Sequence, residues 1–259
     1  MLKENERLDR VNDDLRLIQK TDGLTFGTDA LLLAGYVRGA HRLGAELGAG
    51  SGIISMLALA RNKIERIYAF EVQPEYAELT GRNAALNSLS DRLVPICLDI
   101  REVSGEHREK YDAVLTNPPY MKAKSGRQNE VSAKNIARHE IYGTIRDFTE
   151  AAARLLKYGA SLYAVYRPDR LADIMEAMRE CSLEPKRMTF VHADANSKPS
   201  MLLVEARKGG KCGLLLTKPL IIYENKTSRV YTRDMEYIDK TGSFPREFFT
   251  ERSGEKDEG

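Results

Sequence analysis

The chain has 259 residues, of which 42% are hydrophobic and 30% are charged, and its formal net charge of +2 suits one principal globular domain. No apolar run approaches the roughly 18 residues of a membrane span, and the charged N-terminus excludes a signal peptide, so we expect a cytoplasmic protein with no membrane partner. Three widely separated cysteines and four histidines without metal-ligand spacing exclude a disulfide framework and a metal site, and nothing indicates an obligate protein partner.

The first residues of the chain predict a short segment that precedes the main domain. Residues 15–19 alternate apolar and polar side chains like a half-buried strand. Thr28 and Asp29 then predict the cap of an apolar helix over residues 30–37. We expect residues 1–40 to form this strand and helix.

Alternating strands and helices follow over residues 41–208. The expected strands are 45–47, 64–70, 94–98, 111–116, 161–166, 186–192 and 201–207, and the expected helices are 53–61, 74–87, 145–157 and 168–181. Gly159 should close the third helix. The last two strands are too close for a helical crossover and should pair antiparallel. We therefore expect an α/β, Rossmann-like, doubly wound and mostly parallel sheet of seven strands with an antiparallel last strand.

A glycine-rich segment follows the first of these strands. It carries an acid and then glycine at every second position: Glu46, Gly48, Gly50 and Gly52. A dinucleotide fingerprint spaces its glycines differently. Closely set glycines let a cofactor lie against bare backbone, and Glu71 after the next strand can accept both ribose hydroxyls. Such a loop and carboxylate suit S-adenosylmethionine as well as NAD. Glu71 can equally be an ordinary surface carboxylate, and Asp99 after the third strand can equally be a helix cap.

The segment after the fourth strand, Asn117-Pro118-Pro119-Tyr120, carries the most informative chemistry. An exocyclic or amide NH2 delocalises its lone pair and attacks a methyl sulfonium poorly unless hydrogen-bond acceptors localise that pair. The Asn117 oxygen and the Pro118 carbonyl can accept its two N–H groups, and the Tyr120 ring can stack on a planar substrate. The motif indicates methyl transfer to an amino nitrogen, although Pro-Pro after a strand also forms a plain rigid turn.

Polar residues follow four of the expected strands. Ligands of doubly wound sheets bind outside the carboxyl ends of the strands, near the topological switch. Glu46 with Gly48, Glu71, Asp99 and Asn117 should all meet there. The sequence therefore predicts one site at this edge.

On these motifs the chain resembles the class I S-adenosylmethionine-dependent methyltransferases that carry Asn-Pro-Pro-Tyr. More narrowly, it resembles the bacterial tRNA1(Val) adenine N6-methyltransferase family from about residue 14 to residue 208. The resemblance is carried by the segments Thr21–Ala34, Glu46–Gly52, Asn117–Tyr120 and Ala137–Glu140. It implies S-adenosylmethionine as cofactor and an adenine of structured RNA, in a tRNA anticodon loop, as substrate.

The resemblance also implies roles for single residues. Around the cofactor these are Thr28 and Asp29 near its carboxylate, Glu46, Gly48 and Gly50 along its methionine end, Glu71 at the ribose and Asp99 at the adenine. Asn117 would lie where cofactor and substrate meet. With Pro118 and Tyr120, it would bind the target base.

Two basic stretches indicate how RNA would be held. Residues 120–140 carry two acidic side chains and five basic ones, and the basic ones are Lys122, Lys124, Arg127, Lys134 and Arg138. Residues 205–233 carry two acidic side chains and seven basic ones. Both can line a phosphate backbone, and both can equally be solvated surface. We expect RNA contacts from the first stretch and from residues 209–259, a basic and partly ordered appendage with a disordered end.

Four alternatives stay open. A protein-glutamine N5-methyltransferase meets the same demand for an NH2 acceptor, but usually carries a helical N-terminal domain that the 45 residues before Glu46 do not resemble. A guanine-N2 methyltransferase of ribosomal RNA is the closest variant. A DNA adenine methyltransferase would need a target-recognition domain, and a non-catalytic RNA-binding module would leave Asn-Pro-Pro-Tyr without a chemical reason.

Overall fold

The structure, a computed structural model, describes residues 2–21, 26–103, 105–118, 143–225, 227 and 229–249. Tyr120, the five basic residues between 120 and 140, the segment Ala137–Glu140 and the chain end after residue 249 lie outside the described residues.

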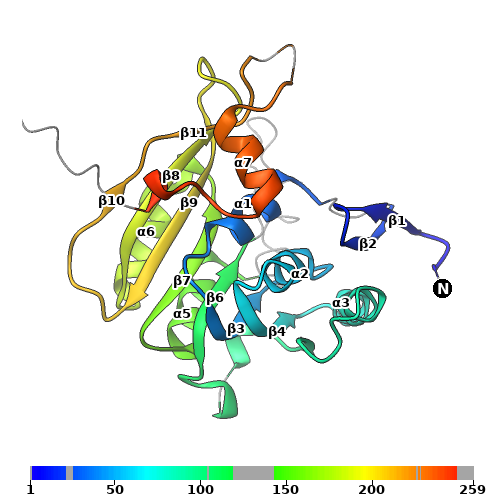
Figure 1. The fold of residues 1–259 in the computed structure, drawn as a ribbon. Coiled ribbons are helices and arrows are strands. Elements are labelled where there is room, and N and C mark those ends of the chain that lie inside the picture. The colour runs from blue at the N-terminus through cyan, green and yellow to red at the C-terminus, as the bar shows by residue number, and fades with distance from the viewer. Residues whose placement is uncertain are drawn as a thin grey trace, which may run out of the picture.

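Among the described residues, a nine-stranded sheet forms the centre of the fold (Figure 1), in the order β10-β8-β9-β7-β6-β3-β4-β5 with β11 also paired to β8. The strands are β3 (His41–Leu47), β4 (Ile64–Glu71), β5 (Leu93–Cys97), β6 (Tyr111–Thr116), β7 (Leu156–Tyr166), β8 (Leu183–His192), β9 (Pro199–Lys208), β10 (Leu215–Leu216) and β11 (Leu220–Ile221). The seven expected strands are all present, and β9 runs antiparallel to both its neighbours as predicted. The short strands β10 and β11, which the sequence did not predict, add parallel to the outer edge of β8.

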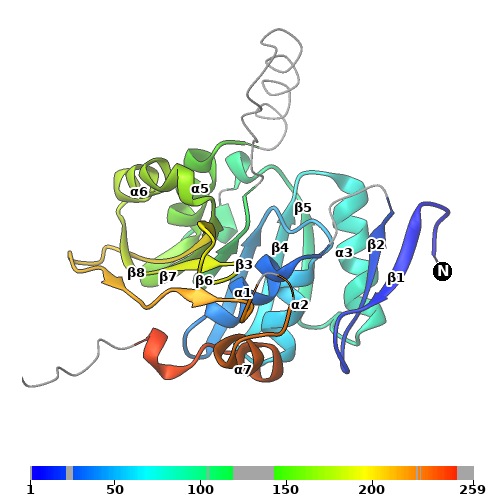
Figure 2. The ribbon, with the colours of Figure 1, turned by 90° about the horizontal axis from the view of Figure 1, so that it is seen from above.

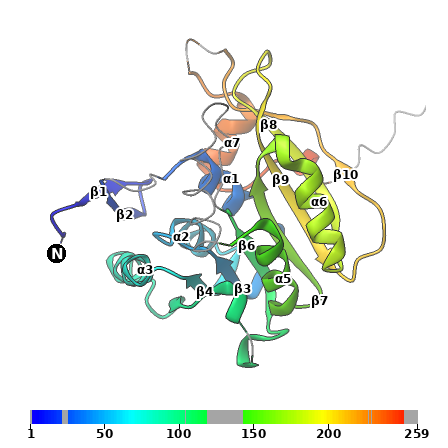
Figure 3. The same ribbon diagram turned by 180° about the vertical axis from the view of Figure 1, so that it is seen from behind.

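Helices cover both faces of this sheet. One face carries α1 (Thr28–Tyr36), α2 (Ile53–Ala60), α3 (Pro74–Leu86) and α7 (Arg233–Thr241), and the other carries α5 (Ile145–Leu155) and α6 (Leu171–Glu180). Figure 2 shows α5 and α6 on one side of the strands and α1, α2 and α7 on the other, and Figure 3 shows α5 and α6 from their own side. The doubly wound arrangement is therefore confirmed.

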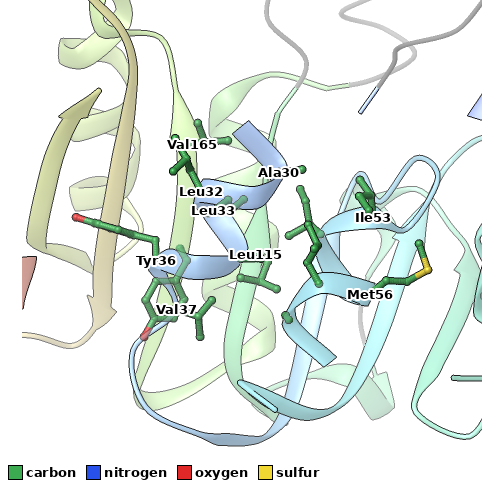
Figure 4. Packing of buried hydrophobic residues seen from close by; sticks show 14 of the residues in the cluster. Ala30, Leu32, Leu33, Tyr36, Val37, Ile53, Met56, Leu115 and Val165 are labelled. Carbon is green, nitrogen blue, oxygen red and sulfur yellow. The ribbon is translucent and has the colours of Figure 1, made fainter. Parts of the chain in front are cut away.

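The strand pattern explains why both faces are covered. On β6, Ala113 and Leu115 enter the cluster under α1 and α2, while Val114 enters the cluster under α5 and α6. A strand that is apolar on both sides has to be buried on both sides. Helix α1 lies in the first cluster, where Leu32 and Leu33 are fully buried beside Leu115 (Figure 4).

Two boundary predictions on the second face are wrong. Helix α5 ends at Leu155, and Gly159, expected to close it, lies inside strand β7 with φ +80°. Leu156 is fully buried and pairs with Tyr111 of β6. Because burial and strand pairing outweigh local helix propensity, the strand starts before the glycine.

The C-terminal segment packs onto the first face of the sheet. Met235 and Ile238 of α7 and Phe248 are fully buried, and Phe244 is nearly so, in the cluster that also holds α1 and α2. The division into ranges 1–40, 41–208 and 209–259 stays a prediction. Described residues of all three ranges nevertheless contribute to this one cluster.

An N-terminal hairpin lies beside α3. Strand β2 (Arg16–Lys20) was expected from the sequence. It pairs antiparallel with β1 (Glu6–Arg10), a strand that was not predicted. The second edge of β2 is occupied by Asn83 of α3 and by Asn87, the residue that caps the C-terminal end of that helix. Asn83 accepts from the Ile18 N–H at 2.8 Å and donates to its carbonyl at 3.1 Å, and Asn87 bonds Arg16 in the same way at 2.9 and 2.7 Å. Asn83 also donates to the Ser51 carbonyl at 2.9 Å, which connects the hairpin to the glycine-rich loop.

Within the described ranges, helices long and apolar enough to cross a lipid bilayer are absent.

Candidate functional site

The carboxyl ends of the central strands meet at one edge of the sheet. Leu47, near the end of β3, pairs with Phe70 of β4 on one side and Thr116 of β6 on the other. Glu71 pairs with Cys97 of β5. The residues that follow each strand therefore converge, as the sequence indicated.

This edge lies at the topological switch of the sheet. The chain runs outward from β3 through β4 to β5 and then returns to the other side of β3 as β6. In open α/β sheets the ligand crevice forms where the winding reverses. Glu46 in β3 and Asn117 after β6 stand on the two sides of that point.

The glycine-rich loop leaves bare backbone at one of its glycines. Gly48 and Gly50 have φ of +70° and +56°, a region that side chains rarely adopt. Among the described residues, a Cβ on Gly50 would meet no atom within 4 Å, whereas a Cβ on Gly52 would lie 2.8 Å from Cγ2 of Thr80. The described residues leave the space over Gly50 open to a ligand, and Gly52 is needed instead for packing against α3.

Glu71 holds this loop in place. The carboxylate is almost fully buried; one oxygen accepts from the Gly50 N–H at 2.9 Å and the other from the Gln73 N–H at 3.0 Å. Thr80 donates to the Gly50 carbonyl at 2.8 Å, so both backbone groups of Gly50 are fixed. A carboxylate has about four lone-pair sites, which leaves Glu71 able to accept further hydroxyl groups.

Glu46 is a buried acid with one oxygen that the described residues leave unpaired. Its Oε2 accepts from the backbone N–H of Ser55 at 3.0 Å and from the Ser55 hydroxyl, while Oε1 is buried without a hydrogen-bond partner among the described residues. Burial raises the pKa of Glu46 to about 8, because desolvation outweighs the Ser55 hydrogen bonds that lower it. Buried polar atoms are seldom left unpaired, so Oε1 indicates a place for a ligand.

We expect Glu46→Gln to remove a pH-dependent loss of stability. The unfolded carboxyl releases its proton near pH 4.5, whereas the folded one keeps it until about pH 8. The folded state thus binds more protons in this window, and wild-type stability falls as pH rises, by at most about 1.4 kcal/mol per pH unit. The glutamine side chain does not titrate and escapes this loss.

Urea unfolding at several pH values between about 5 and 8 measures the difference. The free energy of unfolding of Glu46→Gln minus that of wild type should rise with pH. Glu65→Gln, which changes an exposed carboxyl on β4, is the matched control and should show a constant difference. A constant difference for Glu46→Gln as well would contradict the prediction.

Asn117 and Asp29 form a contact across the site. The Asn117 side chain donates from Nδ2 to Oδ2 of Asp29 at 2.7 Å, and its Oδ1 is buried without a hydrogen-bond partner among the described residues. Pro118 follows and is buried. The site therefore presents an amide oxygen that the described part of the fold leaves unpaired.

The expected cap of α1 is wrong. The helix begins at Thr28, so Thr28 and Asp29 lie in its first turn, and the cap residue is Gly27 with φ −127° and no side-chain hydrogen bond. Thr28 remains at the N-terminal end of α1, next to Asp29. Its role at a cofactor stays a prediction.

Asp99 lies two residues beyond β5 and acts as a helix cap. Its Oδ1 accepts from the Arg101 N–H at 2.9 Å at the start of the turn Ile100–Glu102. The hydrogen bond from the Arg101 guanidinium lowers the pKa of the Asp99 carboxyl. The role of Asp99 as a helix cap is thus observed, and its contact with the adenine of a cofactor stays a prediction.

Sequence reasoning missed three residues, Ser55, Gln73 and Thr80, and the contact between Asp29 and Asn117. Ser55 alone had a local signal, because it is the one polar residue of the apolar run in α2. Among the described residues, no three His, Cys, Asp or Glu side chains are grouped to hold a metal ion.

The chain is similar to several known proteins. Residues 20–183 match the family model of the methyltransferase small domain. A curated relative from Aliivibrio fischeri (strain MJ11), named tRNA1(Val) (adenine(37)-N6)-methyltransferase, is 31% identical over 184 residues, which are 71% of this chain and 77% of that protein. A relative of the same name from Porphyromonas gingivalis (strain W83) is 28% identical over 190 residues, 70% of this chain and 73% of that protein.

Solved structures show the same architecture. A protein described as a predicted O-methyltransferase from Agrobacterium tumefaciens has a TM-score of 0.69 and 25% sequence identity, and the match covers 84% of this chain and 98% of that chain.

Proposed function

This chain belongs to the methyltransferase small domain family and, within it, to the tRNA1(Val) (adenine(37)-N6)-methyltransferases, and on that basis we propose that it methylates N6 of an adenine in tRNA. The donor in this proposal is S-adenosylmethionine. The observation that carries the proposal is the buried Oδ1 of Asn117 at the switch point of the sheet, which has no hydrogen-bond partner among the described residues.

An unpaired buried acceptor costs roughly 1–3 kcal/mol, and a donor that enters the site offsets this cost. The exocyclic NH2 of adenine is such a donor. Pro118 brings no N–H of its own that would compete for the acceptor. The site is therefore arranged to accept from an incoming amino group.

The residues at this edge fit S-adenosylmethionine. Among the described residues, the space over Gly50 is open and the buried Oε1 of Glu46 lacks a hydrogen-bond partner, which leaves room and a hydrogen-bonding position for a ligand. We assign Glu46, Gly48 and Gly50 to the methionine end and Glu71 to the ribose; Asp99 is left for the adenine ring and Thr28 for the carboxylate side. When bound, the cofactor supplies an electrophilic methyl group on its sulfonium.

The chain contributes orientation and electrostatics. Asn117 Oδ1 accepts one N–H of the target amino group, and the Pro118 carbonyl accepts the other, which localises the nitrogen lone pair. We assign the Tyr120 ring, outside the described residues, to stacking on the flipped base. A general base is not required before transfer, since the proton can leave to water afterwards.

RNA binding is proposed mainly for the stretch around residues 120–140. Its basic residues Lys122, Lys124, Arg127, Lys134 and Arg138 lie outside the described residues. The second basic stretch is partly neutralised within the fold, because Lys208 pairs with Glu109 at 2.9 Å and Lys218 with Asp234 at 2.7 Å. Fewer of its charges are left for phosphates than the sequence suggested.

Methylation with radiolabelled S-adenosylmethionine tests the proposed function. Unmodified tRNA1(Val) transcript should take up label, and nucleoside mass spectrometry should find N6-methyladenosine. The same transcript with guanine in place of adenine 37 is the matched control and should stay unlabelled. Label in protein, or in N2 of ribosomal guanine, would replace the proposal with the corresponding alternative, and RNA binding without label would indicate a binding module.

A further inference from the structure

We propose that Asp29 is a positioning residue that sets the rotation of the Asn117 amide. In this orientation the amide oxygen, and not the NH2 group, faces the target amino group. The inference rests on the proposed function and deepens it. Its basis is the hydrogen bond from Asn117 Nδ2 to Asp29 Oδ2 at 2.7 Å, between residues 88 positions apart in the sequence.

The two ends of an asparagine amide have nearly the same shape and opposite hydrogen-bonding roles. Only the oxygen can accept from a substrate NH2, so an amide turned by 180° would present donors to donors. A carboxylate accepts only, and it therefore selects the NH2 end of Asn117. The rotated amide would place its oxygen against the Asp29 carboxylate, which electrostatic repulsion disfavours.

Asp29 is itself held on a rigid element. It is the second residue of α1, in the first turn, where the helix dipole favours a negative side chain. The helix is anchored by Leu32, Leu33 and Tyr36, each fully buried, and Figure 4 shows this packing. The carboxylate is thus carried by a packed helix rather than by a free loop, which limits its movement.

Gly27 gives the carboxylate its space. A Cβ added to Gly27 would lie 2.6 Å from Oδ1 of Asp29, which is closer than non-bonded atoms approach. The backbone of Gly27 has φ −127° and ψ 175°, which alanine adopts without strain. Gly27→Ala should therefore fold and displace the Asp29 carboxylate, and it gives a second way to perturb the contact that leaves Asp29 and Asn117 in the sequence.

Two other roles for Asp29 make different predictions. If Asp29 is a cofactor ligand, as the family resemblance implies, its removal should lower the affinity for S-adenosylhomocysteine. If Asp29 only stabilises the N-terminus of the helix, its removal should lower the unfolding temperature and leave the turnover per folded molecule unchanged. Asp234 is the second residue of α7 and is the matched control for that helix effect.

The experiment compares Asp29→Ala, Asp29→Asn, Gly27→Ala and Asp234→Ala with wild type. For each protein it measures kcat and KM on tRNA1(Val) transcript, the Kd of S-adenosylhomocysteine by calorimetry, and the unfolding temperature. We expect Asp29→Ala and Gly27→Ala to lower kcat by about 10- to 100-fold, the size expected for a misplaced catalytic group, with Kd nearly unchanged. Asp29→Asn should recover much of the rate, since its amide oxygen can still accept from Asn117. Asp234→Ala should keep kcat.

Wild-type kcat in Asp29→Ala would overturn the inference, and so would a Kd that rises in proportion to the loss of rate. Failure of the proposed function looks different, because wild type itself would then not methylate adenine 37. If wild type instead labels another amino or amide nitrogen, the same variants are compared on that substrate. A wild type that methylates nothing would overturn both.

Discussion

Asn117→Ala is expected to lower kcat for methyl transfer by about 10³-fold, while S-adenosylhomocysteine binds with nearly unchanged affinity. The variant removes the buried oxygen that accepts from the target NH2 and leaves the loop formed by Gly50 and Glu71 intact. Without that acceptor the amino lone pair stays delocalised in the ring. Single-turnover methylation of tRNA1(Val) transcript and calorimetry with S-adenosylhomocysteine measure the two quantities.

Thr116→Val is the matched control for this variant. Thr116 precedes Asn117 and donates to the Leu47 carbonyl at 3.1 Å, so the control also removes one hydrogen bond at the same strand end. It should lose about 1 kcal/mol of stability and keep its methylation rate. Equal losses of affinity and rate in Asn117→Ala would instead identify Asn117 as a cofactor ligand.

The largest expected effect on stability belongs to Arg187, a buried arginine in β8 that is 3% exposed. Its guanidinium pairs with Glu205 of β9 at 3.0 Å and donates to the Tyr36 carbonyl at 2.6 Å. It also stacks on two aromatic rings, with centroid distances of 3.6 Å to Tyr36 and 4.4 Å to Phe249. One side chain therefore connects α1, two strands and the C-terminal segment.

Arg187→Ala should lower the free energy of unfolding by roughly 3–5 kcal/mol, because it leaves the Glu205 carboxylate buried without its charge partner. Urea unfolding measures the loss. Arg207→Ala, which removes an exposed arginine from β9, is the matched control and should change stability little. The double variant Arg187→Met with Glu205→Leu should recover a large part of the loss, because it leaves no buried charge. A loss below about 1 kcal/mol in Arg187→Ala would contradict this account.

Much of the fold could be predicted because its signals are local. Strand β6 was placed correctly from its six-residue apolar run, and β2, α2, α3, β4 and β5 within one or two residues. The rim position of Asn117 followed from these elements, since parallel strands end at the same edge of a sheet. The two short strands β10 and β11 could not be found, because two paired residues each leave no periodic pattern.

Contacts between distant residues were the main gap at the site. Asp29 was assigned to the cofactor by resemblance, and only the structure brings it to the Asn117 amide. In the same way Arg187 carried no visible signal, because an arginine in a strand is ordinarily exposed. Its burial depends on how α1 and the C-terminal segment close over β8.

The sequence by itself determined which chemical groups stand at the ends of the strands, because strand periodicity and glycine spacing are written in neighbouring residues. The tertiary structure decided which of those groups face each other and which oxygens remain unpaired within the described part of the chain. The physical reason is that hydrogen bonding at the site depends on the relative position of helices and strands that pack from distant parts of the chain. The two oxygens of Glu46 and Asn117 that lack a partner among the described residues become buried only when that packing is complete.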